Sequence, residues 1–287
     1  MSSTLSMLRD RLLETRNADH GWGYLPGRIS RIEPTAWAVL ALAEDAPQSR
    51  NALVAWRRHG GLVTDTSENH LNYAYNALAA IALAASQDTL PIGFAVVRAL
   101  MEVGGVTWSR RASSGLDPSL RGWAWYPDTF SWVEPTALCA IAAKRVRHLG
   151  FGAGADPRVA EAERLLLDRV CAEGGWNYGN SIVFGQRLRA DVPTTAIALI
   201  AMQDRMREAP VMASLRWLER HAVLEPSTMG LGLATIALSI LDAAAHRPLF
   251  ELEALVRRDG ENMNLAGLAI AAYALGWERH GFEAFRF

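Results

Sequence analysis

Apolar, alanine-rich stretches alternate with amphipathic stretches along almost the whole chain. Each apolar stretch has hydrophobic residues at helical spacing on nearly all sides, a pattern that predicts a buried helix. The amphipathic stretch before it carries arginines on one side, as an outer helix would. The pattern therefore predicts six outer helices, at residues 3–17, 48–59, 91–104, 157–172, 209–222 and 247–258. It also predicts six inner helices, at residues 72–85, 229–244 and 264–275 and in segments that open at Pro34, Pro135 and Pro193.

Three of the six pairs share a lead-in, by which we mean the loop and first turn that precede the apolar helix. The lead-ins read GWGY and EPTA at residues 21–24 and 33–36, GWAWY and EPTA at 122–126 and 134–137, and GWNY and DVPTTA at 175–178 and 191–196. Proline is favourable at the first position of a helix, because its missing N–H would have no partner there. We therefore expect each lead-in proline to open its inner helix.

The alternation of buried and amphipathic helices fits two concentric rings. An open solenoid of helix pairs would satisfy the same periodicity. Closure is favoured because the pairs number six and neither end carries a polar capping repeat. With no proline-rich or low-complexity linker, the 287 residues predict an all-α fold, a single α/α toroid of six helix pairs over residues 1–287.

The GWxY loop, the EPTA turn and the Ala/Leu helix that follows resemble the repeats of a known group. They are similar to those shared by protein prenyltransferase β subunits and squalene–hopene or class II terpene cyclases, over about residues 17–280. The resemblance implies a central cavity for an isoprenoid or similar apolar natural-product substrate. It also implies isomerase or lyase chemistry, with no cofactor.

Both sets of functional residues of that group are incomplete in this chain. Where the prenyltransferases place the thiolate that binds zinc, the lead-ins carry Thr35 and Thr136. Zinc commonly takes four ligands, and His70, Cys139 and one carboxylate remain as an unusual alternative set, although we expect no metal. The acid motif of the cyclases, DxDDTA, is replaced by DVPTTA at 191–196, which lacks its proton donor.

Two glutamates stand where the proton donor of the cyclases would lie, two residues before the lead-in threonine. Glutamate is a poor N-cap, so Glu33 and Glu134 at these cap-like positions invite an explanation. Their carboxylates could interact favourably with the helix dipole or pair with loop arginines. Alternatively, Glu134 first, and then Glu33 and Asp191, serve as acid or base at the mouth of an apolar cavity. Desolvation there would raise a carboxyl pKa and keep the group protonated.

The lead-in loops also carry arginines and aromatic residues. Arg31, Arg187 and Arg189 are candidates for holding a polar head such as a diphosphate, or for pairing with the lead-in acids. Aromatic faces can stabilise a carbocation. Candidates that would line the substrate cavity are Tyr73, Tyr75, Trp108, Trp125, Phe130 and Trp132. The lead-in tryptophans Trp22, Trp123 and Trp176 are instead expected to pack between neighbouring pairs.

Composition narrows the functional classes. The 30 acids nearly balance the 29 bases, which argues against a nucleic-acid partner. The start of the chain lacks a basic segment followed by an apolar core, and the longest apolar run, residues 77–85, is far shorter than the ~20 residues that span a bilayer. We therefore expect a cytoplasmic protein with no integral membrane segment.

The function expected from the sequence is a terpenoid-cyclase-like enzyme that cyclises or isomerises its substrate by acid–base chemistry. The alternative is a non-catalytic toroid that binds a hydrophobic ligand or a protein. A toroid glycosidase with paired carboxylates is less favoured, because sugar sites need polar side chains and this interior is rich in alanine and leucine.

Overall fold

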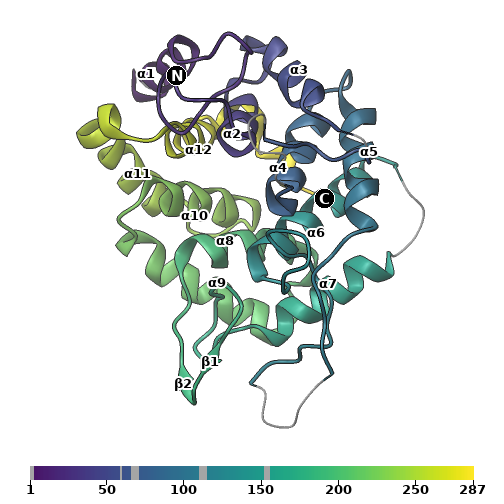
Figure 1. The fold of residues 1–287 in the computed structure, drawn as a ribbon. Helices are drawn as coiled ribbons and strands as arrows, with labels where there is room; N and C mark the ends of the chain where they lie inside the picture. Colours follow the sequence, from purple (N-terminus) through teal and green to yellow (C-terminus); the bar gives the residue numbers. More distant parts are fainter. Residues whose placement is uncertain (1–2, 59, 66–70, 110–114, 152–155) are drawn as a thin grey trace.

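The fold is an all-α toroid of two concentric rings (Figure 1). The computed structural model describes residues 3–58, 60–65, 71–109, 115–151 and 156–287. The inner ring consists of α2 (Ile32–Leu42), α4 (Tyr73–Ala84), α6 (Val133–His148), α8 (Val192–Ala201), α10 (Thr228–Ile240) and α12 (Leu265–Leu275). The outer ring consists of α1 (Ser3–Glu14), α3 (Pro47–Ala55), α5 (Leu90–Met101), α7 (Pro157–Asp168), α9 (Ala209–His221) and α11 (His246–Asp259). A short helix, α13 (Trp277–His280), and a hairpin of β1 (Ile182–Val183) and β2 (Gln186–Arg187) complete the elements used below.

The inner ring is closed. Each inner helix packs against the next one along the chain, and α12 packs against α2. In an open solenoid the first and last inner helices would not touch. The prediction of a closed toroid of six helix pairs is therefore confirmed, and its cause is the burial of nearly every side chain of the inner helices.

The lead-in prolines do not open their helices as expected. The inner helices begin at Ile32, Val133 and Val192, so that proline is the third residue of α2 and α6 and the second of α8. The first four N–H groups of any helix lack intrahelical partners, so proline is tolerated throughout the first turn. The prediction was wrong by one or two residues for this reason.

The lead-in tryptophans make the same contacts in all three repeats. Each is fully buried, and its indole N–H donates a hydrogen bond to the end of the outer helix of its own pair, at the carbonyls of Leu12, Leu100 and Leu166 (2.7, 2.8 and 2.7 Å). Its backbone N–H donates to the lead-in threonine, Thr35, Thr136 or Thr195 (2.9, 3.0 and 2.9 Å). The tryptophans therefore join the two helices of one pair rather than two neighbouring pairs.

Neighbouring pairs are joined two residues after each tryptophan. The carbonyls of Tyr24, Trp125 and Tyr178 accept hydrogen bonds from the first backbone N–H of a neighbouring inner helix, in α12, α4 and α6 respectively (2.8, 3.0 and 3.1 Å). These bonds satisfy N–H groups that a helix start leaves without partners. The repeated lead-in is thus a device that closes the ring.

The C-terminal segment covers the opposite end of the inner ring. Phe285 is buried and stacks on Trp37 of α2, with ring centroids 5.6 Å apart. The guanidinium of Arg286 donates to the carbonyls of Ser239 and Ile240 at the end of α10 (3.0 and 3.3 Å). In the described part of the chain, no helix is long and apolar enough to cross a membrane.

Candidate active site

The acids singled out in the sequence gather at one end of the inner ring. Glu33 and Glu134 are the second residues of α2 and α6, and Asp191 is the N-cap of α8. Closure of the ring brings these helix starts together, and the charges of Glu33 and Asp191 both act on Glu134. We call this end of the toroid the acidic mouth. The two glutamates are not N-caps as expected, because those positions hold Arg31 and Trp132.

Glu134 has the most perturbed carboxyl group of the three. Burial, followed by the nearby charges of Glu33 and Asp191, raises the pKa of Glu134 to about 8. The dipole of α6 alone would favour the ionised form and lower this pKa. Desolvation and like charge outweigh it, so the carboxyl of Glu134 is largely protonated at neutral pH.

Glu33 lies in a cluster with two phenols. Tyr24 donates a hydrogen bond to the Glu33 carboxylate, and the hydroxyls of Tyr24 and Tyr75 lie 3.4 Å apart. Burial raises the pKa of Glu33, while hydrogen bonds from both tyrosines act in the opposite direction. The ring of Tyr75 meets that of Trp125 edge-on at 6.0 Å, which brings both predicted aromatic residues to the mouth.

Arg31 lies beside an acid that the sequence analysis did not single out. Asp65 is buried, accepts a hydrogen bond from the first N–H of α2 at Ile32 (2.8 Å) and forms an ion pair with Arg31 (3.1 Å). Asp65 thus caps α2 from another part of the chain. Of the roles considered for Arg31, the structure supports pairing with an acid.

Asp191 borders an open hollow of about 420 Å³ at the mouth. Its carboxylate accepts a hydrogen bond from the N–H of Thr194 (2.8 Å), while burial and, more weakly, the charge of Glu225 raise the pKa of Asp191. The hollow is lined by Trp132, Asn177, Tyr178, Asn180, Leu188, Arg189 and Asp191. Trp132 and Arg189 therefore lie beside Asp191, and their role in substrate binding stays a prediction.

Other candidates lie further away. Tyr73 is buried and Arg187 is exposed in β2. Phe130 meets Trp132 edge-on at 6.2 Å, and Trp108 stacks on Phe130 at 5.2 Å with more than half of its own surface exposed. These three rings form a row that leads outward from the hollow.

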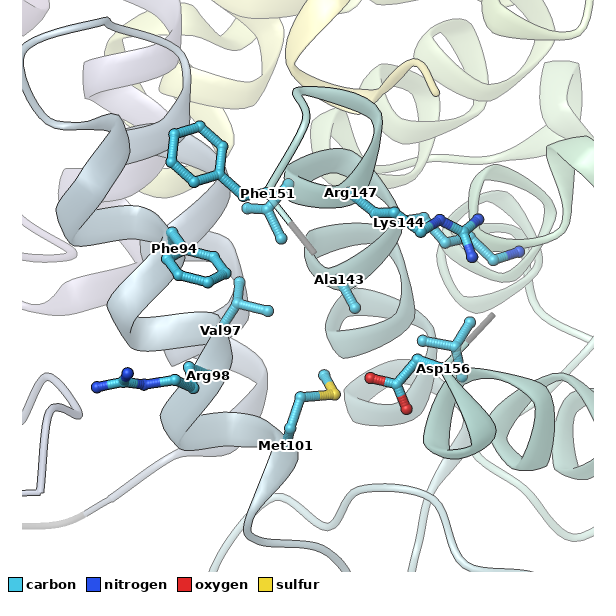
Figure 2. Close-up of a pocket in the computed structure, with 11 residues that line it drawn as sticks. Phe94, Val97, Arg98, Met101, Ala143, Lys144, Arg147, Phe151 and Asp156 are labelled. Carbon is cyan, nitrogen blue, oxygen red and sulfur yellow. The ribbon is translucent and has the colours of Figure 1, made fainter. Parts of the chain in front are cut away.

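A second hollow, of about 280 Å³, lies between α5, α6 and α7 (Figure 2). Phe94, Met101 and Phe151 line it, whereas the amine of Lys144 points away from it (Figure 2). The carboxylate of Asp156, at its edge, caps α7 by accepting a hydrogen bond from the N–H of Arg158 (2.8 Å). None of the mouth acids borders this hollow.

The zinc alternative gains no support from the described residues. Among them, no group of three or more histidines, cysteines and acids is arranged to hold a metal ion. Cys139 is fully buried, its thiol lies 3.7 Å from the Tyr73 carbonyl, and burial raises the pKa of that thiol well above its ordinary value. His70 lies outside the described residues.

No protein-family model matches the chain, and no curated protein matches its sequence. Among solved structures, a β-1,3-1,4-glucanase from Paenibacillus sp. X4 superposes with a TM-score of 0.58 over 99% of this chain and 92% of the glucanase, at 9% identity. The type II terpene cyclase MstE from Scytonema gives a TM-score of 0.37 over 76% of this chain and 78% of the cyclase, at 18% identity. A glycosidase gives 0.38 over 97% and 96%, at 9% identity. The similarity to the glucanase shows the α/α toroid fold.

Proposed function

We propose that the protein is an acid–base enzyme of the terpenoid-cyclase type. It would cyclise or isomerise an isoprenoid or similar apolar natural-product substrate at the acidic mouth. The observation that supports this most directly is the carboxyl of Glu134, whose pKa of about 8 leaves it able to donate a proton at neutral pH. A general acid works best when its pKa lies near the operating pH.

Other groups at the acidic mouth suit the steps that follow protonation. The proton would pass from the carboxyl of Glu134 to an alkene carbon or an epoxide oxygen, which leaves a carbocation on the substrate. The aromatic rings of Tyr75 and Trp125 could stabilise this cation. When the cation loses a proton, the carboxylate of Glu134 or the adjacent Glu33 would receive it, so that cyclisation consumes no proton overall.

A second candidate function is glycoside hydrolysis. The hollow beside Asp191 combines the aromatic rings of Trp132 and Tyr178 with the amides of Asn177 and Asn180. Polar donors next to aromatic faces suit a sugar better than an isoprenoid chain. Glycosidases pair one neutral carboxylic acid with one carboxylate, roles that Glu134 and Asp191 could fill.

A product screen separates these functions. Purified protein would be incubated with geranyl, farnesyl and geranylgeranyl diphosphates, squalene, oxidosqualene and a mixed-linkage β-glucan, with and without EDTA. We expect an isoprenoid product that persists in EDTA and falls by roughly 10²-fold or more in Glu134→Gln. The matched control is Glu173→Gln, an exposed acid of the same lead-in loop as Asp191, which should retain full activity.

Each other outcome contradicts the first proposal in a different way. Release of sugars from the glucan, dependent on Glu134 and Asp191, would favour glycoside hydrolysis. A product abolished by EDTA would point to a metal and remove Glu134 from its role. Tight binding of an apolar compound without turnover would favour the non-catalytic toroid.

A further inference from the structure

The loop between α7 and α8 carries a hairpin that projects from the body of the toroid (Figure 1). Val183 of β1 pairs with Gln186 of β2, so Phe184 and Gly185 form a two-residue turn at its tip. Phe184 is fully exposed, with a relative accessibility of 101%. Such exposure of a phenylalanine leaves its whole ring in water.

The backbone at the tip is also unfavourable for phenylalanine. Phe184 and Gly185 both have positive φ angles, 49° and 77°, as in a type I′ turn. That turn favours Asn-Gly, because a larger side chain is strained in the left-handed region. Phe184 therefore has both an unfavourable backbone conformation and an unfavourable exposure of its ring. Positions with such local conflicts are often functional sites. Transfer of the ring to an apolar environment would offset both costs.

The chemistry around the tip identifies the environment that would accept it. Ile182 and Leu188 are exposed beside Phe184, and Arg187 and Arg189 are exposed on the second half of the hairpin. Residues 182–189 contain no acid. Apolar side chains flanked by arginines suit the surface of an anionic membrane, where the rings enter the acyl boundary and the guanidinium groups meet phosphates.

Exposed apolar side chains gather in the lead-in loops at this end of the toroid, of which the hairpin is a part. The described parts of the three long lead-in loops, residues 15–31, 102–109, 115–132 and 169–191, lead to the inner-helix starts at the acidic mouth. Of the thirteen exposed large hydrophobic residues in the described part of the chain, eight lie in these loops: Leu25, Ile29, Trp108, Tyr126, Tyr178, Ile182, Phe184 and Leu188. The hairpin would therefore bring an apolar rim to the lipid.

We propose that the hairpin of residues 182–189 is a lipid anchor that docks the acidic mouth on the surface of an anionic membrane. The contact is peripheral and involves no spanning helix. The lipid contact does not depend on the proposed function.

Vesicle co-sedimentation tests the anchor without any substrate. Wild-type protein should bind vesicles of phosphatidylcholine and phosphatidylglycerol in a 7:3 ratio, and should bind pure phosphatidylcholine vesicles more weakly. Phe184→Asn should weaken binding about tenfold or more, since the ring would leave the lipid. The double variant Arg187→Gln, Arg189→Gln should lose about fivefold for each arginine and most of the salt dependence.

The controls separate lipid binding from folding. Phe184→Asn suits the turn better than phenylalanine, so its melting temperature should equal or exceed that of the wild type. Phe250→Asn removes another exposed phenylalanine ring, 70% accessible, from the outer helix α11, and should bind vesicles as the wild type does. Wild-type protein that ignores both vesicle types, or equal binding by Phe184→Asn, would overturn the proposal. Failure of the product screen would leave this result unaffected.

Discussion

Buried charged groups lie among like charges at one end of the inner ring and among opposite charges at the other. At the acidic mouth, Glu33, Glu134 and Asp191 lie near one another, and burial together with neighbouring acids raises the pKa of each. Towards the opposite end, the buried amine of Lys144 lies 2.7 Å from Glu163 and 2.6 Å from Asp204, and donates to the Ala201 carbonyl (2.8 Å).

Glu163 shows how pairing changes the outcome of burial. Burial alone would raise the pKa of Glu163, but hydrogen bonds from Arg205 and Lys144 bring it below its ordinary value. The same kind of side chain is therefore held ionised at one end of the ring and neutral at the other. Opposite charges offset the cost of burial at one end, whereas clustered like charges add to that cost at the other, as is common at functional sites.

The largest expected effect concerns the paired end. Lys144→Met would leave Asp204 and part of Glu163 without their buried partner, and should lower the free energy of unfolding by about 3–5 kcal/mol. Urea denaturation at pH 7 measures this loss in the free energy of unfolding. Arg258→Met removes one member of an exposed ion pair with Asp259 and should have no measurable effect. Equal stability of both variants would show that the two ends do not differ as described.

The second effect is the change of folding stability with pH that is caused by Glu134 at the mouth. Between about pH 4.5 and 8, the folded protein keeps Glu134 protonated while the unfolded chain ionises it. The folded state then binds more protons, so stability is greatest below this window and declines as pH rises through it. The decline should amount to a few kcal/mol, because one pKa unit corresponds to about 1.4 kcal/mol.

Urea denaturation at pH 5, 7 and 9 checks this dependence. Glu134→Gln cannot ionise, so its stability should vary less with pH, and at pH 9 the variant should be more stable than the wild type. Glu173→Gln is the control, because that acid is exposed and its variant should follow the wild-type curve. A steep decline that persists in Glu134→Gln would assign the pH dependence to other groups.

The helices and the meeting of the lead-in acids follow from the sequence, because each depends on a short repeated pattern. Burial on all sides of the inner helices predicts a layer of paired helices, the six pairs favour its closure into a ring, and either arrangement brings every inner-helix start to one end. The equivalence of Thr35, Thr136 and Thr195 then places Glu33 and Glu134 at the mouth. No long-range information is needed for these steps.

Other features depend on contacts between distant segments, which periodicity does not report. Tyr73 and Tyr75 are equal candidates in the sequence, yet the start of α4 buries the first and turns the second toward Glu33. Asp65 stands in no repeat, although it caps α2. The hairpin was not predicted either, because its turn carries Phe184 where a type I′ turn favours asparagine.

The smallest effect sharpens the comparison with a matched pair of N-caps. Asp191 caps α8 at the acidic mouth, and Asp156 caps α7 of the outer ring. Asparagine caps a helix about as well as aspartate, so either Asp→Asn change removes charge but keeps the capping bond. Asp191→Asn relieves the desolvation and repulsion that raise its pKa, and should raise stability at pH 7 by up to about 1 kcal/mol.

Asp156→Asn should have the opposite sign. Its carboxylate accepts a hydrogen bond at the favourable start of α7, and loss of that charge should cost about 0.3–1 kcal/mol. Thermal melts of both variants at pH 7 measure the difference. At pH 3 the carboxyl of Asp191 is protonated in the wild type, because its pKa is raised, so the stabilisation by Asp191→Asn should vanish there. A loss of stability in both variants at pH 7 would mean that the charged carboxylate of Asp191 stabilises the folded protein. It would contradict the view that the acids of the mouth repel one another.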